Sequence, residues 1–342
     1  MIVPTRSLPV LAVLALTAPH GAAADRDGWT RPPALKPGDT IAFVAPAGPA
    51  NPDRVRAAKE RFESMGFRVR VPATLTARKD RYLAGSDDDR AAELNAAIKD
   101  KTVQAVFAVR GGYGLTRILD RIDYRALRDH PKIITGFSDL TALHLAIARE
   151  CRLVTFHAPM PQASLHRDDG GHGYSADVFW RTVRADKYPN GGAGFTIPLP
   201  ADRPKPKGLV PGKARGRLVG GNLSLLAATV GTPYQVEADG NILFIEDTGE
   251  AAYRVDRMLS QLRLAGLLGK FAGVVVGTFD GTDERELEAV LRDYFGKSKV
   301  PVMTGFPVGH TAYNATLPHG GLAEMDADAG TVRLLEAPVA VK

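Results

Sequence analysis

The strongest constraint on the fold is an alternation of apolar runs and helical stretches between Thr40 and Pro159. The apolar runs TIAFVAPA, VQAVFAVR, KIITGF and LVTFHAP have the length and composition of buried strands. Helical patterns separate them, and one of these, RAAELNAAIK, follows Ser86 and three aspartates, a pattern typical of a helix N-terminus. The alternation predicts an α/β fold in which helices cover both faces of a parallel sheet.

The chain is long enough for two domains, and its pattern changes twice along the sequence. We predict an N-terminal α/β domain over residues 36–165. Residues 166–212 are rich in Gly, Pro, Asp and Arg and have little periodicity, which favours a linker or excursion. Strand and helix patterns resume in residues 213–342, with the strand-like runs NILFIED and GVVVGTF. This region is expected to form a smaller C-terminal α/β domain.

The first 24 residues have the pattern of a secretion signal. Arg6 precedes the apolar run Leu8–Thr17, and Ala22–Ala24 forms a small-residue cleavage site. The run is too short to span a bilayer, which takes roughly 20 residues. We therefore expect an exported, for example periplasmic, protein; an uncleaved membrane anchor is the alternative. No later segment is long and apolar enough to cross a membrane, so we expect no stable membrane insertion after signal removal.

Charge and spacing argue against two further classes of site. The formal net charge of +6 is mild for 342 residues, and no dense Lys/Arg block with interleaved aromatic residues occurs. Nucleic acid is therefore not an expected partner. The polar group around residues 166–172 contains two His and two Asp, but its spacing fits no zinc or calcium template. We predict a solvated loop there, and no metal site; the residues are His166, Asp168, Asp169 and His172.

Ser138 lies between the apolar run KIITGF and the helical pattern that follows. A serine at such a junction sits on a sharp turn, with its hydroxyl beside the unpaired first N–H groups of the helix. α/β hydrolases present their nucleophile in this way. The match to G-x-S-x-G is incomplete, because Leu140 stands where the last Gly would be. The alternative is an ordinary strand–helix turn in which Ser138 only caps the helix.

A serine nucleophile needs a base, and the base needs an acid that orients it. His310 follows the run VMTGFPVG, near the carboxyl end of a predicted strand, where α/β sheets bind ligands. His157 ends another strand and is an alternative base. Glu246 ends the apolar strand ILFI, so its carboxylate is expected to be paired or catalytic; Asp247 and Glu250 are plausible substitutes. Acid and base would lie in a different domain from the serine, which predicts an active site in the cleft between domains.

Two glycine-rich turns are further candidates for binding. Arg110–Gly114 follows the strand VQAVFAV, and it is interpreted as a phosphate cradle, as a tight turn without a ligand, or as half of an oxyanion hole. In the last case the N–H group of Gly112 would face that of Asp139. The second turn contains Asn222, which would either bind substrate amides or cap the helix that it precedes.

Seven sequence blocks between about residue 36 and residue 327 can be considered together. They are GDTIAFVAPAGP, RYLAGSDDDRAAEL, VRGGYG, ITGFSDLTALH, RGRLVGGNLSLLAATVGTPY, LFIEDTGEAAYRVDRML, and GFPVGH followed by LPHG. In their sequence and order, these blocks resemble one family, the LD-carboxypeptidases. These serine peptidases include the murein-tetrapeptide carboxypeptidases and the microcin-C-hydrolysing immunity proteins.

The resemblance implies a catalytic triad in which Ser138 attacks, His310 is the base and Glu246 orients it. It also implies an oxyanion hole at Gly112 and Asp139, no metal or organic cofactor, and a homodimer. The fold implied is a flavodoxin-like or amidotransferase-like N-terminal domain with a C-terminal domain of distinct topology. Polar residues beside the matched blocks are candidate substrate contacts; they are Tyr113, Asn222, Glu250 and Arg254.

The implied substrate is a murein tetrapeptide, from which the enzyme would remove the terminal D-Ala by hydrolysing an L–D peptide bond. Well-known family members that recycle murein are cytoplasmic, whereas the first 24 residues of this chain have the pattern of an export signal. An exported enzyme would meet peptides of the cell wall itself or of shed fragments. The alternatives are a microcin-C-type hydrolase of peptide–nucleotide amides and a non-catalytic periplasmic muropeptide-binding protein.

Overall fold

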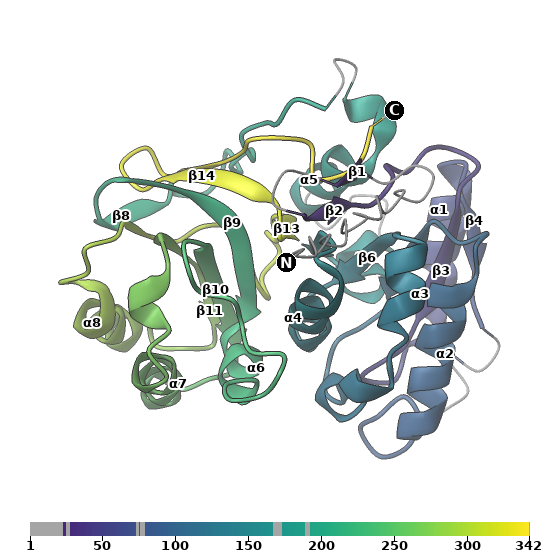
Figure 1. Ribbon diagram of the computed structural model, residues 1–342, viewed down its shortest axis with the longest axis horizontal. Helices are drawn as coiled ribbons and strands as arrows, with labels where there is room; N and C mark the ends of the chain where they lie inside the picture. Colours follow the sequence, from purple (N-terminus) through teal and green to yellow (C-terminus); the bar gives the residue numbers. More distant parts are fainter. Residues whose placement is uncertain are drawn as a thin grey trace, which may run out of the picture.

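The computed structural model describes residues 23–24, 28–72, 75, 79–166, 173–188 and 192–341. Most of the predicted signal peptide, residues 1–22, lies outside the described residues, as do Asp168, Asp169 and His172. The described chain forms two lobes, each built on its own sheet (Figure 1). A two-stranded sheet pairs β1 (Ala23–Ala24) with β2 (Thr30–Arg31).

The N-terminal lobe is a doubly wound parallel sheet. Its strand order is β13-β7-β6-β5-β3-β4, and all neighbours are parallel except the added edge strand β13. Without β13, the order in the sheet is 2-1-3-4-5 by sequence, which is the flavodoxin-like order. The strands are β3 (Thr40–Val44), β4 (Arg68–Arg70), β5 (Ala105–Ala108), β6 (Ile133–Gly136), β7 (Thr155–His157) and β13 (Leu317–His319).

Helices cover both faces of this sheet, as the apolar runs predict. Alternate residues of β3 pack into different cores: Ile41 and Phe43 face α1 and α5, whereas Ala42 and Val44 face α2 and α4. Each strand therefore buries both of its faces, which explains its continuous apolar sequence. The helices are α1 (Pro52–Ser64), α2 (Asp87–Lys99), α3 (Tyr124–Asp129), α4 (Leu140–Cys151) and α5 (Tyr174–Val183).

The C-terminal lobe has a mixed sheet of order β15-β14-β9-β10-β11-β12-β8. Its four central strands, β9 to β12, are parallel, and antiparallel strands close both edges. The strands are β8 (Lys207–Val210), β9 (Lys213–Asn222), β10 (Ile242–Thr248), β11 (Gly273–Asp280), β12 (Val302–Thr304), β14 (Leu322–Asp326) and β15 (Thr331–Leu334). The helices are α6 (Leu223–Ala228), α7 (Ala252–Leu264) and α8 (Glu284–Phe295).

The segment predicted as a linker, residues 166–212, contains more regular structure than its composition suggests. Helix α5 lies within it, and Phe179 and Trp180 of α5 are buried in the core of the N-terminal lobe. The Trp180 ring lies 5.2 Å from Phe62 and 5.4 Å from Phe67, measured between ring centroids. Strand β8, at the end of the segment, joins the C-terminal sheet. Helix α5 has only 10 residues and is flanked by Gly- and Pro-rich segments, so hydrophobic periodicity does not identify it in the sequence.

The boundary at residue 213 also differs from a simple division into two domains. Strand β13 belongs by sequence to the C-terminal half, yet it pairs with β7 of the N-terminal sheet. The last described residues return as well: the N–H of Ala340 donates to the carbonyl of Pro32, and Val339 is buried with the N-terminal core. Figure 1 shows the C-terminus beside α5. The two lobes are therefore tied together by strand pairing and by the tail.

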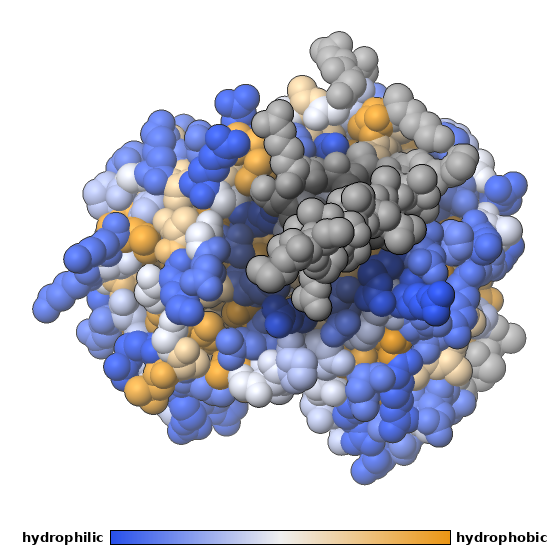
Figure 2. Space-filling view, in the orientation of Figure 1, coloured by the Kyte–Doolittle hydropathy of each residue, from blue (hydrophilic) through white to orange (hydrophobic). Residues whose placement is uncertain are grey.

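The visible surface in Figure 2 is mostly hydrophilic, with apolar residues in scattered spots. Among the described residues, no helix has the length and apolar character needed to span a membrane.

Candidate active site

Ser138 has the backbone conformation expected of a nucleophile on a sharp turn. Its φ angle is +67°, one of three positive values among the described non-glycine residues. Helix α4 begins two residues later with Asp139 at the N-cap, and no side chain caps this end of the helix. The alternative that Ser138 only caps the helix is therefore wrong. A strained φ of this kind costs about 1–3 kcal/mol and is typical of functional sites.

The incomplete G-x-S-x-G match has a packing explanation. Gly136 ends β6 with a φ of +155°, and a Cβ atom there would lie 2.7 Å from Cγ of Leu140. The first glycine of the motif thus makes room for the leucine that replaces the last one. Leu140 is 1% exposed and packs into the core beneath the turn. The turn keeps its shape although one glycine is missing.

The predicted acid and base are in contact. Nδ1 of His310 lies 2.6 Å from Oε2 of Glu246, at the carboxyl end of the C-terminal sheet. Glu246 lies on β10 and is fully buried, and His310 follows β12 after a loop. Gly309 permits this approach: its φ is +134°, and a Cβ there would lie 2.3 Å from Oγ1 of Thr278 and 3.1 Å from Oε2 of Glu246.

The pair has the electrostatics of a base held by an acid. Burial lowers the pKa of His310, but the hydrogen bond and the charge of Glu246 outweigh that effect and raise the pKa above its ordinary value. Burial raises the pKa of Glu246, and the hydrogen bond from His310 opposes this rise. His310 is therefore stabilised in its protonated form, the form that it takes after it accepts a proton.

Phe137 brings the nucleophile and the base to the same place. The Phe137 ring lies 4.8 Å from the His310 ring, measured between centroids, and Ser138 is the next residue in the chain. The N–H of Asn222 donates to Oγ1 of Thr141 across the same junction between lobes, at 3.0 Å. A Cβ on Gly221 would lie 2.4 Å from that oxygen, so only glycine allows the approach. These contacts support an active site between the lobes.

The glycine-rich turn after β5 packs directly against Ser138. A Cβ on Gly111 would lie 2.8 Å from Cβ and 3.1 Å from Oγ of the serine. The carboxylate of Asp139 accepts the N–H of Leu115 at 2.9 Å and so ties the turn to the start of α4. Burial raises the pKa of Asp139 to about 6, against the opposing effects of this bond and of Arg90. Gly112 and Asp139 thus belong to two segments that meet at Ser138; their role as an oxyanion hole stays a prediction.

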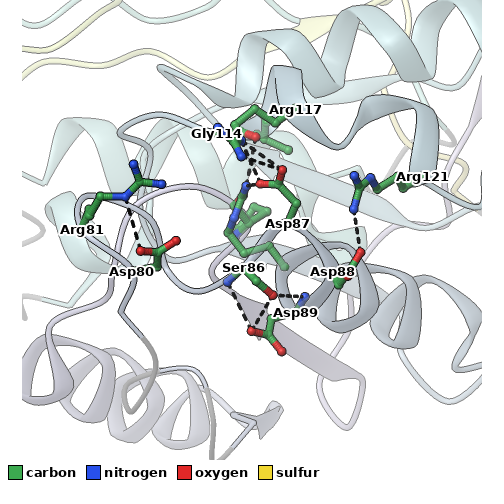
Figure 3. A network of polar contacts seen from close by, with 12 residues as sticks. Asp80, Arg81, Ser86, Asp87, Asp88, Asp89, Gly114, Arg117 and Arg121 are labelled. Atoms are coloured by element: carbon green, nitrogen blue, oxygen red, sulfur yellow. Dashed lines mark hydrogen bonds and ion pairs between the residues drawn. The ribbon is translucent and has the colours of Figure 1, made fainter.

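Arg90 supports the same turn, and the sequence analysis missed it. The side chain is fully buried, and its Nη1 donates to the carbonyls of Pro46 and Gly114 at 2.6 and 2.9 Å. Its Nη2 pairs with Asp87, which also binds Arg117 at 2.8 Å. Figure 3 labels Asp87, Gly114 and Arg117 of this network, with Ser86, the N-cap of α2, beside them. The available signal was an arginine placed among the inward-facing apolar residues of a helix.

The candidate substrate contacts lie in different surroundings. Asn222 caps α6 and donates to Oδ1 of Asp247 at 2.8 Å, so the capping interpretation is correct. Asp247 also accepts bonds from Ser224 and does not orient His310, which rules it out as the substitute acid. A role for Asn222 in binding substrate stays a prediction.

The other three candidates are accessible. Tyr113 is 47% exposed and lies 5.7 Å from Tyr82, measured between ring centroids. Glu250 and Arg254 pair with each other at 3.5 Å near the start of α7. No contact among the described residues connects these three with Ser138 or His310, so their roles stay predictions.

His157, the alternative base, has no acid beside it. It is fully buried, and neither ring nitrogen has a hydrogen-bond partner among the described residues. Its ring neighbours are Phe244 at 5.3 Å and Phe137 at 5.9 Å. Burial lowers its pKa well below the ordinary value. His157 is therefore part of the packing beneath the site.

Several known proteins are similar to this chain over most of its length. A probable murein peptide carboxypeptidase of Bacillus subtilis is 39% identical over 302 residues, which cover 86% of this chain and 91% of the relative. The microcin self-immunity protein MccF of Escherichia coli is 30% identical over 88% of this chain and 94% of its own length. A solved muramoyltetrapeptide carboxypeptidase from Oxalobacter formigenes superposes with a TM-score of 0.75 at 31% identity, covering 88% of this chain and all of that one.

A structure of MccF in complex with glutamyl sulfamoyl guanosine gives a TM-score of 0.83 at 27% identity, covering 90% of this chain and 99% of that one. Two family models match: the LD-carboxypeptidase N-terminal domain over residues 41–158, and the LD-carboxypeptidase C-terminal domain over residues 215–325. The two-domain α/β architecture, the order of the motifs and both matches agree, and the chain belongs to the LD-carboxypeptidase family.

Proposed function

We propose that this protein is a serine carboxypeptidase that releases the terminal D-Ala from murein tetrapeptides by hydrolysing an L–D peptide bond. The observation that carries the proposal is the contact of 2.6 Å between His310 and Glu246, together with a serine of φ +67° whose neighbour Phe137 packs against the His310 ring. The similarity to a murein peptide carboxypeptidase supports the choice of substrate.

In the proposed mechanism, His310 removes the proton of the Ser138 hydroxyl through Nε2 while Oγ attacks the peptide carbonyl. Glu246 holds Nδ1 and stabilises the imidazolium that forms. His310 then protonates the leaving amine of D-Ala, and an acyl-enzyme remains on Ser138. Water, deprotonated by the same histidine, hydrolyses the ester and restores the enzyme.

The backbone N–H groups of Gly112 and Asp139 are the proposed donors to the oxyanion. The packing of Gly111 against Ser138 supports this assignment, because it keeps the turn next to the attacked carbonyl. A preorganised donor of this kind is worth about 3–4 kcal/mol of transition-state stabilisation. A homodimer is a further proposal, based on the family resemblance alone.

We also propose that the protein acts outside the cytoplasm. The apolar run Leu8–Thr17 and the cleavage site at Ala22–Ala24 support export. The substrate would then be a tetrapeptide stem of the cell wall or of its soluble fragments.

A second candidate is the hydrolysis of a peptide–nucleotide amide. The overlap with MccF bound to glutamyl sulfamoyl guanosine favours it. The export signal weighs against it if the conjugate is intracellular, so we rank it second.

Mass spectrometry tests the main proposal. Purified mature protein is incubated with L-Ala-γ-D-Glu-meso-diaminopimelate-D-Ala, and loss of one alanine is followed for wild type, Ser138→Ala and an EDTA-treated sample. Ser64→Ala is the matched control, because Ser64 is an exposed serine at the end of α1. Cleavage by all samples except Ser138→Ala is expected. If folded wild type does not cleave the tetrapeptide, hydrolysis of a nucleotide amide or peptide binding without catalysis becomes the favoured function. Cleavage by Ser138→Ala would refute Ser138 as the nucleophile.

A further inference from the structure

A cationic pocket lies at the carboxyl edge of the N-terminal sheet, the edge at which Ser138 follows β6. Its volume is about 650 Å³, and its walls come from the loops after β3, β4, β5 and β7 and from the start of α1. The lining residues that matter here are Asn51, Arg54, Lys79, Arg110, Met160 and Gln162. In the sequence the three cations lie far apart, and only the fold brings them together.

The pocket contains three positive charges and no carboxylate. Arg54, Lys79 and Arg110 line it, and the lining contains no Asp or Glu. Among the described residues, no acid pairs with any of the three within 4.0 Å. The nearest acid of α1, Asp53, pairs instead with Arg56 at 2.8 Å. Three cations that have no acidic partner within the described part of the chain surround one hollow, and such a group attracts an anion.

The walls of the pocket are held in place by polar contacts. Oε1 of Gln162 accepts the N–H of Asn51 at 2.6 Å, and the N–H of Gln162 donates to Val109 at 3.0 Å. Nη1 of Arg110 donates to the carbonyl of Pro49 at 3.2 Å. These bonds join the loops after β3, β5 and β7, so this part of the pocket is formed in advance rather than by the ligand.

The position in the fold favours ligand binding. Strands β3 and β5 are neighbours from which the chain proceeds in opposite directions across the sheet, and ligands of open α/β sheets bind at such a switch point. The N-terminus of α1, with Asn51 as its cap, adds the positive end of a helix dipole. Arg110 directly precedes Gly111, which packs against Ser138.

We infer that this pocket is an anion subsite that binds a carboxylate of the peptide on the acyl side of the scissile bond. The inference rests on the proposed function. The leaving amine must lie near His310, on the C-terminal lobe, because His310 protonates it. The pocket is built only from the N-terminal lobe, so the part of the substrate that remains on Ser138 is the one that reaches it. Murein stems carry carboxylates on that side, at the γ-linked D-glutamate and at the diamino acid.

The test uses the double variant Arg54→Gln/Lys79→Gln and leaves Arg110 in place, since Arg110 also ties the turn before Gly111 to Pro49 in the loop after β3. The control Lys59→Gln/Lys297→Gln removes the same charge away from the pocket. Steady-state kinetics are measured on the tetrapeptide and on three analogues. One has D-isoglutamine for D-glutamate, one has L-lysine for diaminopimelate, and one has a C-terminal amide.

We expect KM for the tetrapeptide to rise about tenfold in the pocket variant, with kcat within twofold, because the lost contacts bind ground state and transition state alike. Of the D-isoglutamine and L-lysine analogues, one should have the same raised KM in wild type and in the pocket variant. The carboxylate that this analogue lacks is the one that the pocket binds. If the C-terminal amide is the analogue that removes the difference, the pocket binds the leaving residue and the assignment is wrong. An equal loss in the control would also overturn it.

Binding separates this inference from the proposed function. Calorimetry gives Kd of the tetrapeptide for Ser138→Ala with and without Arg54→Gln/Lys79→Gln, and turnover by wild type is measured separately. If wild type turns over the tetrapeptide and Kd is the same with and without Arg54→Gln/Lys79→Gln, the anion subsite is refuted but the proposed reaction is retained. A Kd about ten times weaker in the pocket variant, without turnover by wild type, refutes the proposed reaction but retains the anion site.

Discussion

The two halves of the candidate site are built by different kinds of interaction. On the N-terminal lobe, Ser138 is placed by backbone geometry: a positive φ, close-packed glycines and a turn tied to α4. On the C-terminal lobe, His310 is placed by a buried hydrogen bond to Glu246. Substitutions that disturb backbone geometry or close packing, on either lobe, should mainly change stability, whereas substitutions of the Glu246–His310 pair should mainly change pH dependence.

The largest effect is expected for Glu246→Gln, which keeps the shape of the acid and removes its charge. By analogy with other triads, kcat should fall roughly 10²- to 10⁴-fold. Burial lowers the pKa of His310 and Glu246 more than compensates, so loss of the charge lowers that pKa. His310 must be neutral to act as a base, and activity therefore appears at lower pH in the variant. The pH–rate profile of kcat/KM measures this shift.

Asp247→Asn is the informative contrast, because this neighbouring acid binds Asn222 and Ser224 rather than His310. Asp247→Asn should lower the free energy of unfolding. It should shift the acidic side of the pH–rate profile of kcat/KM less than Glu246→Gln does. Equal profiles for wild type and Glu246→Gln would show that the acid does not tune the base.

Gly309→Ala should lower the free energy of unfolding by about 3 kcal/mol, since strain and overpacking act together. The added Cβ would lie 2.3 Å from Oγ1 of Thr278. Gly305→Ala is the matched control: its φ is +77° with open space around the new atom, and it should cost only about 1 kcal/mol. Urea unfolding measures both. Partial recovery in Gly309→Ala/Thr278→Ala is expected, and no difference between the two glycines would refute the close approach.

The positions of the three predicted catalytic residues could largely be predicted from the sequence, because local patterns determine where strands end. The apolar runs before Ser138 and Glu246 identify strand ends, and strand ends meet at one edge of a sheet. The strained turn at Ser138 and the pairing of Glu246 with His310 were both predicted from motifs. The strand pattern alone leaves Asp247 open as a substitute acid, since neighbouring residues on a strand face opposite sides, and the preference for Glu246 comes from the family resemblance. The structure excludes Asp247, because it binds Asn222 and Ser224 rather than His310.

Long-range pairing could not be predicted. Strand β13 lies in the C-terminal half of the sequence but pairs with β7 of the N-terminal sheet, and its short sequence LPH does not indicate this partner. Arg90 connects Pro46 with Gly114, two carbonyls that lie far from it in the sequence. Helix α5 depends on the contacts of Trp180 with two rings of the N-terminal core. These features come from tertiary packing, which periodicity does not encode.

The histidines beneath the site provide a contrast with His310, because no acid among the described residues pairs with them. Burial lowers the pKa of His144 to about 4 and that of His319 to about 3, and it lowers that of His157 well below its ordinary value. Each stays neutral in the folded protein but gains a proton in the unfolded chain. Their contribution to stability is therefore complete above pH 6.5 and decreases as the pH falls from 6.5 towards 4.

His157→Phe tests this effect, since both ring nitrogens of His157 lack partners and its neighbours are aromatic. The variant should lose less stability than wild type on acidification, by about 2 kcal/mol between pH 7.5 and pH 5. Urea titrations at the two pH values give the difference. Parallel losses in both proteins would mean that His157 is protonated in the folded state.

The smallest effect tests the N-terminal side most directly, because it depends on the sign of a difference. At an ordinary helical position, Ala is more stable than Gly by about 0.5–1 kcal/mol. At Ser138, with a φ of +67°, this order should reverse, since a Cβ is unfavourable in this conformation. The free energy of unfolding of Ser138→Gly should be about 1 kcal/mol larger than that of Ser138→Ala. Ser64→Gly and Ser64→Ala, on α1, supply the ordinary order. Both Ser138 variants should be inactive, so stability and activity separate. If Ala is the more stable residue at both positions, the backbone at Ser138 is not strained, and the nucleophile is positioned by its neighbours instead.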